Sequence, residues 1–145
     1  MPKRNAHTSW TGGLQDGSGR VTLSSSGVGA YDISFPRRAA DNAEGTTSPE
    51  ELIAAAHASC YAMQLSALIA AEGGTPVGLE VDAIVSLAPD PEGGFRIPMI
   101  ELVVRGTVHN MDDSTFKAVA ADAKTKCPVS KALAGTTITL DATLA

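Results

Sequence analysis

One uncharged stretch constrains this chain more than any other feature. Residues 52–71 are twenty consecutive residues without a formal charge, proline or glycine. Ser48, Pro49 and Glu51 precede the stretch in the order of an N-cap, a first helical position and a capping box. A pair of glycines follows it and favours a helix end. We therefore predict a helix over 49–72, which is about 36 Å long at 1.5 Å per residue.

The predicted helix is apolar on every side, and such a helix is either buried or membrane-spanning. Eight of its twenty uncharged residues are alanine, polar residues such as His57 and Gln64 interrupt it, and no basic cluster flanks it. These features argue against a membrane span. A chain with six aromatic residues is too small to enclose such a helix easily. We therefore expect a second copy of the chain to cover it, in a two-fold dimer.

Length, charge and cysteine content exclude several classes of protein. A chain of 145 residues predicts a single domain over 1–145. A net charge of −5 without a basic stripe argues against nucleic acid as a partner. The first residues have no apolar signal segment, so we expect a cytoplasmic protein. In that reducing compartment, Cys60 and Cys127 point to catalysis, redox sensing or metal binding rather than to a structural disulfide.

The rest of the chain alternates between strand and helix patterns. Strands with alternating apolar residues are predicted over 7–12, 20–25, 30–35, 79–87, 95–108 and 136–144, with the fifth broken near Pro98. Glycine-rich turns between the first three strands suit an antiparallel meander. The order of elements predicts an α+β fold in which antiparallel strands surround the long buried helix.

Three further segments join these elements. Residues 36–47 are predicted to form a polar loop. Residues 112–126 are predicted to form a helix capped by Asp113 or Ser114. The apolar stripe of this helix consists of Phe116, Val119, Ala120 and Ala123. Pro128 is predicted to be the first residue of a short helix, which places Cys127 at its N-cap.

The two cysteines have different local surroundings. Cys127 lies at a predicted helix N-terminus near Lys124, Lys126 and Lys131, and both features lower the pKa of a thiol. Cys60 lies in the middle of the long helix, where burial raises the pKa and where a free cysteine can also serve only for packing. From the residues alone, Cys127 is the better nucleophile and Cys60 its partner.

Two other functions remain open at this point. His57 and Cys60 are three residues apart on one helix face. With Cys127 and a carboxylate they could form a tetrahedral zinc site, although the chain has no second close ligand pair. A thiol redox sensor without catalytic turnover is the other alternative.

Two separated sequence segments resemble the OsmC branch of the OsmC/Ohr family. These segments are SPEELIAAAHASCYAM around Cys60 and KCPVSKAL around Cys127, sixty-seven residues later. Members of this family are bacterial thiol peroxidases that reduce organic hydroperoxides. The resemblance runs over nearly the whole chain, and it implies an OsmC-like fold and an intertwined homodimer.

The resemblance also implies roles for the cysteines, in the reverse of the local pKa ranking. Cys60 attacks the peroxide and becomes a sulfenic acid, and Cys127 resolves it as a disulfide. An external dithiol, such as a dihydrolipoyl group, restores both thiols. No cofactor or metal is implied. The apolar residues around Cys60 predict a preference for organic hydroperoxides over hydrogen peroxide.

In this family an arginine held by a glutamate faces the reactive thiol. The glutamate corresponds to Glu50, and the arginine to Arg38, ahead of Arg37 and Arg20 as alternatives. Ten helical residues span about 15 Å, so Glu50 does not touch Cys60 of its own helix. Either Arg38 bridges this distance, or Glu50 of a second chain supplies the contact.

The resemblance assigns no role to His57. We expect it to be a packing residue with one ring nitrogen hydrogen-bonded.

Overall fold

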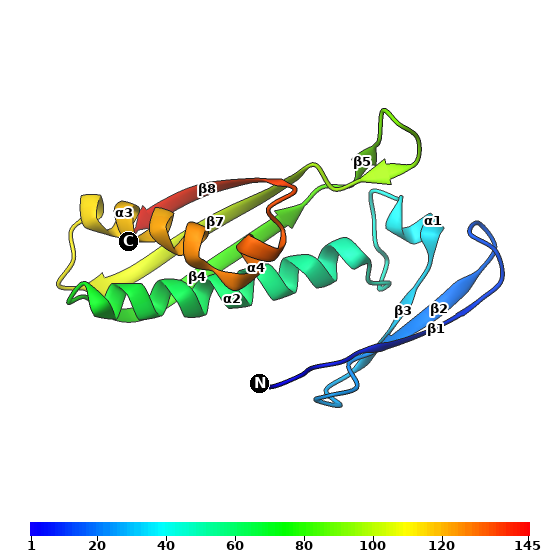
Figure 1. The fold of residues 1–145 in the computed structure, drawn as a ribbon, viewed down its shortest axis with the longest axis horizontal. Helices are drawn as coiled ribbons and strands as arrows, with labels where there is room; N and C mark the ends of the chain where they lie inside the picture. The colour runs from blue at the N-terminus through cyan, green and yellow to red at the C-terminus, as the bar shows by residue number, and fades with distance from the viewer. The chain divides into compact units, whose positions relative to one another are not determined.

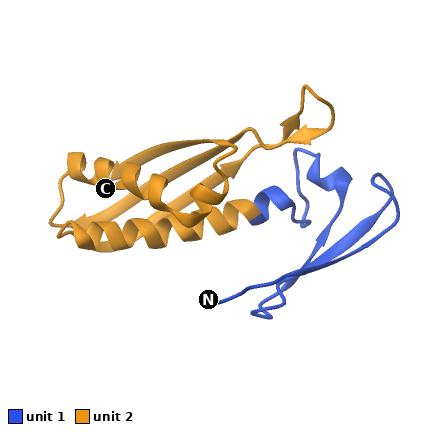
Figure 2. Cartoon of the chain, viewed as in Figure 1, with its two compact units in different colours: residues 1–52 blue, residues 53–145 orange.

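A computed structural model describes all residues, 1–145 (Figure 1). The chain forms two compact units, residues 1–52 (unit 1) and residues 53–145 (unit 2), as Figure 2 shows. The boundary between the units falls inside helix α2 (Pro49–Ala71), whose first turn belongs to unit 1. The predicted long helix is therefore present, with bounds that match within one residue.

Unit 1 contains the predicted meander. Its strands are β1 (His7–Thr11), β2 (Ser18–Thr22) and β3 (Ala30–Ile33), and they form an antiparallel sheet in that order. The β1–β2 turn approaches itself closely at Gly17, where a Cβ atom would lie 2.2 Å from the carbonyl oxygen of Gly13. Glycine is therefore required at this position of the turn.

The segment predicted as a polar loop begins instead with a helical turn, α1 (Phe35–Arg38). The Ser34 hydroxyl accepts a hydrogen bond from the Arg37 N–H, and Pro36 occupies the first turn. The chain then returns to β3, because the Thr47 N–H donates to the Asp32 carbonyl at 3.1 Å. The two ends of the 39–46 segment are fixed in this way at the edge of one sheet.

Helix α2 starts with the predicted N-cap. The Glu51 N–H donates to the Ser48 hydroxyl at 3.2 Å, which is half of a capping box. The Glu51 carboxylate does not return to Ser48; it accepts from the Thr47 hydroxyl at 2.9 Å. Both contacts fix the first turn of α2 relative to the end of the preceding segment.

Unit 2 consists of a three-stranded sheet, a small hairpin and two further helices. After α2 come β4 (Thr75–Val85), β5 (Ala88–Pro89), β6 (Phe95–Arg96), β7 (Met99–His109), α3 (Asp113–Lys126), α4 (Pro128–Ala132) and β8 (Thr137–Leu144). The N-cap of α3 is Asp112, one residue before the predicted pair, and its carboxylate accepts from the Thr115 N–H at 2.7 Å.

The sheet of unit 2 has the order β4-β7-β8. Strands β4 and β7 are antiparallel, as expected, but β7 and β8 are parallel. The prediction of purely antiparallel strands was wrong for this pair. Helices α3 and α4 form a crossover that returns the chain to the start of β7, and a crossover of this kind joins parallel strands.

Helices α2 and α3 pack on one face of this sheet (Figure 1). Alternate residues of β7, including Leu102 and Val104, are buried, whereas Glu101 and Arg105, on either side of this pair, are exposed. Phe116 of α3 lies directly over β7 at Gly106, where a Cβ would come within 2.6 Å of its ring. The predicted apolar stripe of α3 is confirmed, because all four of its residues are buried.

Helix α2 is buried on one side only. Tyr61, Leu65 and Ile69 are fully buried in the core of unit 2. The opposite side is exposed along Ala56, Ser59, Met63, Ala67 and Ala70. The helix is long and apolar enough to cross a membrane by length and composition, but its buried side belongs to a protein core. The expected burial on every side is not met within one chain.

Candidate active site

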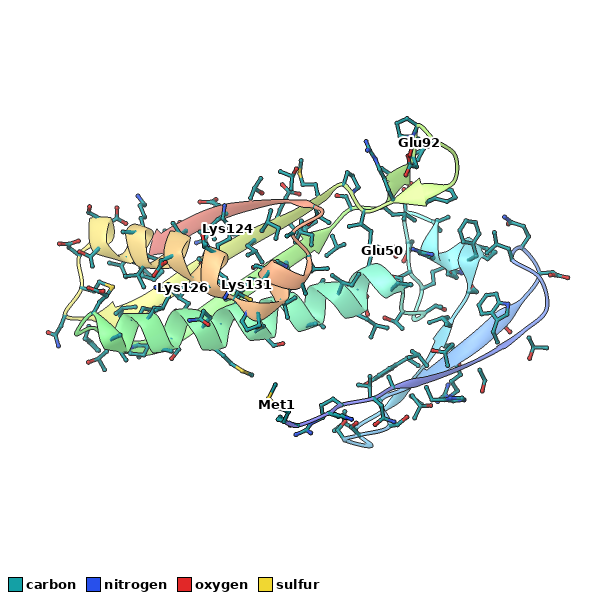
Figure 3. All side chains as sticks on the ribbon, in the orientation of Figure 1. Met1, Glu50, Glu92, Lys124, Lys126 and Lys131 are labelled. Atoms are coloured by element: carbon teal, nitrogen blue, oxygen red, sulfur yellow. The ribbon has the colours of Figure 1, made fainter.

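Arg38 and Glu50 form the best-defined ion pair of unit 1. The Arg38 Nε lies 3.1 Å from both Glu50 oxygens, and its second nitrogen, Nη2, lies 2.7 Å from Oε1. The pair exists because α1 follows β3 directly and the chain then returns to β3 before α2 begins. Glu50 (labelled in Figure 3) is almost fully buried, and Arg38 is about one-third exposed. A fork of this kind fixes the plane of the guanidinium.

The two alternative arginines have other partners. Arg37 pairs with Glu44, and Arg20 pairs with Asp32 at 2.7 Å, both with largely exposed side chains. Exposed pairs of this kind contribute little stability and do not orient a guanidinium strongly. Of the three arginines, only Arg38 contacts Glu50, and it does so within one chain.

The thiols of Cys60 and Cys127 lie next to each other in unit 2. Their sulfurs are 3.2 Å apart, although the residues are sixty-seven positions apart in the chain. Helix α2 carries Cys60, and Cys127 is both the C-cap of α3 and the N-cap of α4. A disulfide bond is about 2.0 Å long, so the sulfurs would have to approach by about 1.2 Å to form one.

Access differs between the two thiols. Cys60 is partly exposed, whereas Cys127 is fully buried. Within unit 2, Cys60 is therefore the more accessible of the two cysteine residues. Accessibility and ionisation together determine which cysteine reacts with an oxidant.

Ionisation favours the other thiol. Burial acts to raise the pKa of Cys127, but the nearby Ser130 backbone N–H, Cys60 thiol, Ser130 hydroxyl and Val129 backbone N–H outweigh it and lower the pKa. Burial raises the pKa of Cys60, and only the Val129 N–H opposes that effect. The local ranking predicted from the sequence is therefore confirmed in its direction.

The predicted cause of this ranking is only half correct. The N-terminus of α4 contributes as expected, but the neighbouring lysines do not direct their charges at Cys127. Lys124 donates to the Ile138 carbonyl at 3.2 Å, and Lys126 pairs with Asp122 at 2.7 Å. Figure 3 labels these side chains and Lys131 along α3 and α4. Backbone amides and a hydroxyl favour the thiolate instead.

His57 is fully buried one turn before Cys60 on α2. Its Nε2 lies 2.7 Å from the Ser130 Oγ, and its Nδ1 has no partner. The expectation of one hydrogen-bonded ring nitrogen is confirmed. Ser130 was not among the predicted site residues, although its place as the third residue of α4, after a cysteine N-cap, was a usable signal.

A pocket of about 260 Å³ lies in unit 1 beside Arg38. Its walls are mainly apolar and are formed by Trp10, Leu14, Ile33, Phe35 and Pro49, together with Ser34 and Thr47. This pocket was not predicted from the sequence, because its residues come from three separate segments of the chain. It combines an apolar surface with one guanidinium.

The zinc alternative has no ligand set in this structure. No group of three or more histidine, cysteine or carboxylate side chains is arranged to hold a metal. The Nε2 of His57 is already hydrogen-bonded to Ser130. His57, Cys60 and Cys127 therefore lack the carboxylate that a tetrahedral site would need.

Comparison with known proteins identifies the family of the chain. A model of the family described as OsmC-like protein matches residues 41–141. Peroxiredoxin OsmC of Escherichia coli (strain K12) is 39% identical over 139 residues, which cover 96% of this chain and 93% of that protein. A protein of the same name from Shigella flexneri has the same identity and coverage.

Solved structures share the fold. The organic hydroperoxide resistance protein OhrB of Bacillus subtilis aligns over 97% of this chain and 98% of its own, with a TM-score of 0.73 and 30% identity. An organic hydroperoxide resistance protein OsmC from Legionella pneumophila aligns over 100% of this chain and 99% of its own, with a TM-score of 0.70 and 22% identity. These matches confirm the resemblance seen in the sequence: the chain belongs to the OsmC-like protein family.

Proposed function

We propose that this protein is a thiol-dependent peroxidase that reduces organic hydroperoxides to alcohols. One observation carries the proposal: the sulfur of Cys60, a partly exposed residue, lies 3.2 Å from the sulfur of the buried residue Cys127. The 39% identity to a curated peroxiredoxin over 96% of the chain supports the same class of reaction.

The proposed reaction has three steps. The Cys60 thiolate attacks the outer oxygen of the hydroperoxide, the O–O bond breaks, and an alcohol leaves after taking up a proton. The Cys127 sulfur then displaces the hydroxyl of the Cys60 sulfenic acid and forms a disulfide. An external dithiol, such as a dihydrolipoyl compound, opens that disulfide by exchange and becomes oxidised itself.

The first step requires a cation at Cys60, because unit 2 alone raises the pKa of this thiol. We assign this role to the guanidinium of Arg38, held by the buried carboxylate of Glu50. Its remaining terminal nitrogen, Nη1, makes no hydrogen bond to the protein, so it is free to contact a thiolate or a peroxide oxygen. The sequence-derived alternatives, Arg37 and Arg20, are bound to other carboxylates.

The pocket beside Arg38 supports an organic substrate. An alkyl group would gain about 25 cal/mol for each Å² of apolar surface that it buries there. Hydrogen peroxide has no such group, so it would gain nothing from the apolar walls. We therefore expect a higher kcat/KM for bulky hydroperoxides than for hydrogen peroxide.

The exposed side of α2 supports a homodimer. Its stripe of alanines and Met63, which is 73% exposed, forms an apolar surface along the helix. A second copy covering this stripe would bury the side of α2 that one chain leaves exposed, as expected for a helix that is apolar on every side. Met63→Glu is expected to convert the dimer to a monomer by light scattering, whereas Thr139→Glu on the exposed face of the sheet serves as the control.

We also propose a cytoplasmic location, where dithiol reductants are available.

The peroxidase activity is tested by following peroxide consumption with a dithiol present, using tert-butyl hydroperoxide and hydrogen peroxide in parallel. Peptide mapping of the oxidised protein should then find a Cys60–Cys127 link. Oxidation without repeated turnover by any dithiol would favour a redox sensor instead.

A further inference from the structure

The pocket beside Arg38 contains the only tryptophan of the chain, Trp10. Its side chain is 42% exposed, and no step of the proposed reaction uses it. Tryptophan has a large apolar ring that gains much from burial. An exposed tryptophan on a pocket wall is therefore the side chain that a bound apolar group would cover with the largest gain.

The Trp10 ring lies over a glycine of the neighbouring strand. Trp10 of β1 pairs with Gly19 of β2, which pairs in turn with Ile33 of β3, so the three residues form one row on one face of the sheet. A Cβ atom on Gly19 would lie 2.8 Å from Cε3 of Trp10 and 3.3 Å from Cγ1 of Ile33. The ring therefore occupies the space that a side chain at Gly19 would fill.

A hydrogen bond holds the indole nitrogen. Nε1 of Trp10 donates to the Gly12 carbonyl at 3.0 Å, in the turn that follows β1. This nitrogen is the only polar group of the side chain, so only carbon atoms of the ring remain for contact with a ligand. A ring that is held by both contacts loses little freedom when a ligand binds, which reduces the entropic cost of binding.

The remaining walls of the pocket are apolar, apart from two hydroxyls and one charged group. Leu14, Ile33, Phe35 and Pro49 line the pocket with Trp10, and Arg38 is the only charged residue among the lining residues. The volume of about 260 Å³ lies below the roughly 300 Å³ at which pockets for drug-sized ligands begin. This volume suits one ring with a short substituent.

We propose that Trp10 is the specificity-determining residue of this pocket, because its fixed indole ring contacts the ring of an aryl-substituted hydroperoxide. This inference deepens the proposed function and rests on it for the reaction. The binding step can be tested without any reaction, because the alcohols that correspond to such hydroperoxides are not oxidants.

Two effects favour an aryl group at this wall. A phenyl ring buries more apolar surface than a methyl group, and the gain in affinity rises with the buried area. Contacts between aromatic rings add about two- to tenfold in affinity beyond the effect of burial. An aryl group therefore gains from Trp10 in a way that a saturated group with the same number of carbon atoms does not.

The first test measures binding to Cys60→Ser protein. The fluorescence of Trp10 is followed during titration with 2-phenyl-2-propanol, 2-cyclohexyl-2-propanol and tert-butanol, which differ only in one substituent. We expect the phenyl alcohol to bind about threefold more tightly than the cyclohexyl alcohol. It should bind at least about tenfold more tightly than tert-butanol. Equal affinities for the phenyl and cyclohexyl alcohols would overturn the proposal.

The second test uses variants, with binding measured by calorimetry. Trp10→Leu keeps an apolar side chain but removes the ring, so it should abolish the preference for phenyl over cyclohexyl. Tyr31→Leu is the matched control, because Tyr31 is also 42% exposed and lies two residues before Ile33, on the same face of the sheet, but does not line the pocket. This control should keep the full preference.

Trp10→Phe provides a second variant if Trp10→Leu does not fold. It retains a smaller ring without Nε1, so it should keep part of the preference for phenyl. A preference that is unchanged in the folded Trp10 variants, or that is lost equally in Tyr31→Leu, would contradict the assignment.

Kinetics separates this inference from the proposed function. In protein with both cysteines, Trp10→Leu should lower the ratio of kcat/KM for cumene hydroperoxide to kcat/KM for tert-butyl hydroperoxide by about fivefold. If the protein consumed no peroxide but preferred the phenyl alcohol, the proposed function would fail and the role of Trp10 in binding would stand. If peroxide were consumed and the phenyl and cyclohexyl alcohols bound equally, only the role of Trp10 would fail.

Discussion

The two cysteines of unit 2 touch each other but occupy different positions in their helices. Cys60 lies inside α2, where its neighbours' amides are used by the helix itself. Cys127 lies at the start of α4, where the first amides have no helical partner, and the amides of Val129 and Ser130 help to lower the pKa of its thiol. Position at a helix start therefore favours ionisation of Cys127, whereas the greater exposure of Cys60 favours its contact with an oxidant.

The largest expected effect separates these two roles. Cys60→Ser should reduce peroxide consumption to background, because it removes the accessible sulfur. Cys127→Ser should allow one turnover and then accumulate a sulfenic acid, which dimedone labelling and mass spectrometry would detect. A Cys60→Ser protein that still turns over peroxide would assign the first step to Cys127 and reverse the comparison.

A smaller effect is expected from the arginine. Arg38→Lys keeps the charge but loses the fork to Glu50, and we expect kcat/KM to fall by about ten- to a hundredfold, since guanidinium and ammonium differ at bidentate sites. Arg20→Lys, a matched change at an exposed pair, serves as the control. Equal losses in the two variants would remove Arg38 from the mechanism.

The ionisation of the two thiols should also depend on pH in different ways. Because the pKa of Cys127 is lowered, its thiolate should persist to a pH below the ordinary range of a thiol and be lost as the pH falls through that lowered value. Arg38→Met should raise the midpoint for Cys60 in Cys127→Ser protein, because it removes the proposed cation.

The same substitution should leave the midpoint for Cys127 in Cys60→Ser protein unchanged. Thiolate absorbance measured from pH 4 to 10 would check both statements. If Arg38→Met does not change the midpoint for Cys60, this thiol ionises without the guanidinium.

The smallest expected effect concerns stability. The Tyr61 hydroxyl donates to the Ala120 carbonyl at 2.9 Å and joins α2 to α3, the helices that carry Cys60 and lead to Cys127. Tyr61→Phe removes this hydrogen bond between the helices and should lower the free energy of unfolding by about 1 kcal/mol. Urea denaturation is the measurement, and Tyr31→Phe at an exposed tyrosine should change little.

Much of the fold followed from local patterns. The run from Leu52 to Ala71 and its flanking caps predicted α2 closely, and the stripe of α3 was correct because a 3.6-residue period marks one buried face. The direction of β8 was not predictable, because alternation along a strand does not encode whether its neighbour is parallel. The α1 turn was missed because four residues are too few to give a period.

The site was predictable only in part. The contexts of Cys60, Cys127, Arg38 and Glu50 could be read from short motifs, and the structure brings them together as two pairs. The partner of His57 depends on how α4 packs on α2, which no local pattern records. The pocket beside Arg38 depends on Trp10 and Leu14 from a distant hairpin, for the same reason.

Pro128 has no N–H, so only the amides that follow it can face the Cys127 sulfur. Those amides stabilise negative charge, and a sulfur that has entered a disulfide carries none. They therefore stabilise the reduced protein and not the oxidised one. Stabilising the reduced form makes the disulfide a stronger oxidant. The first turn of a five-residue helix thus shifts the thiol–disulfide equilibrium towards the two free thiols, and an external dithiol reduces the disulfide more readily.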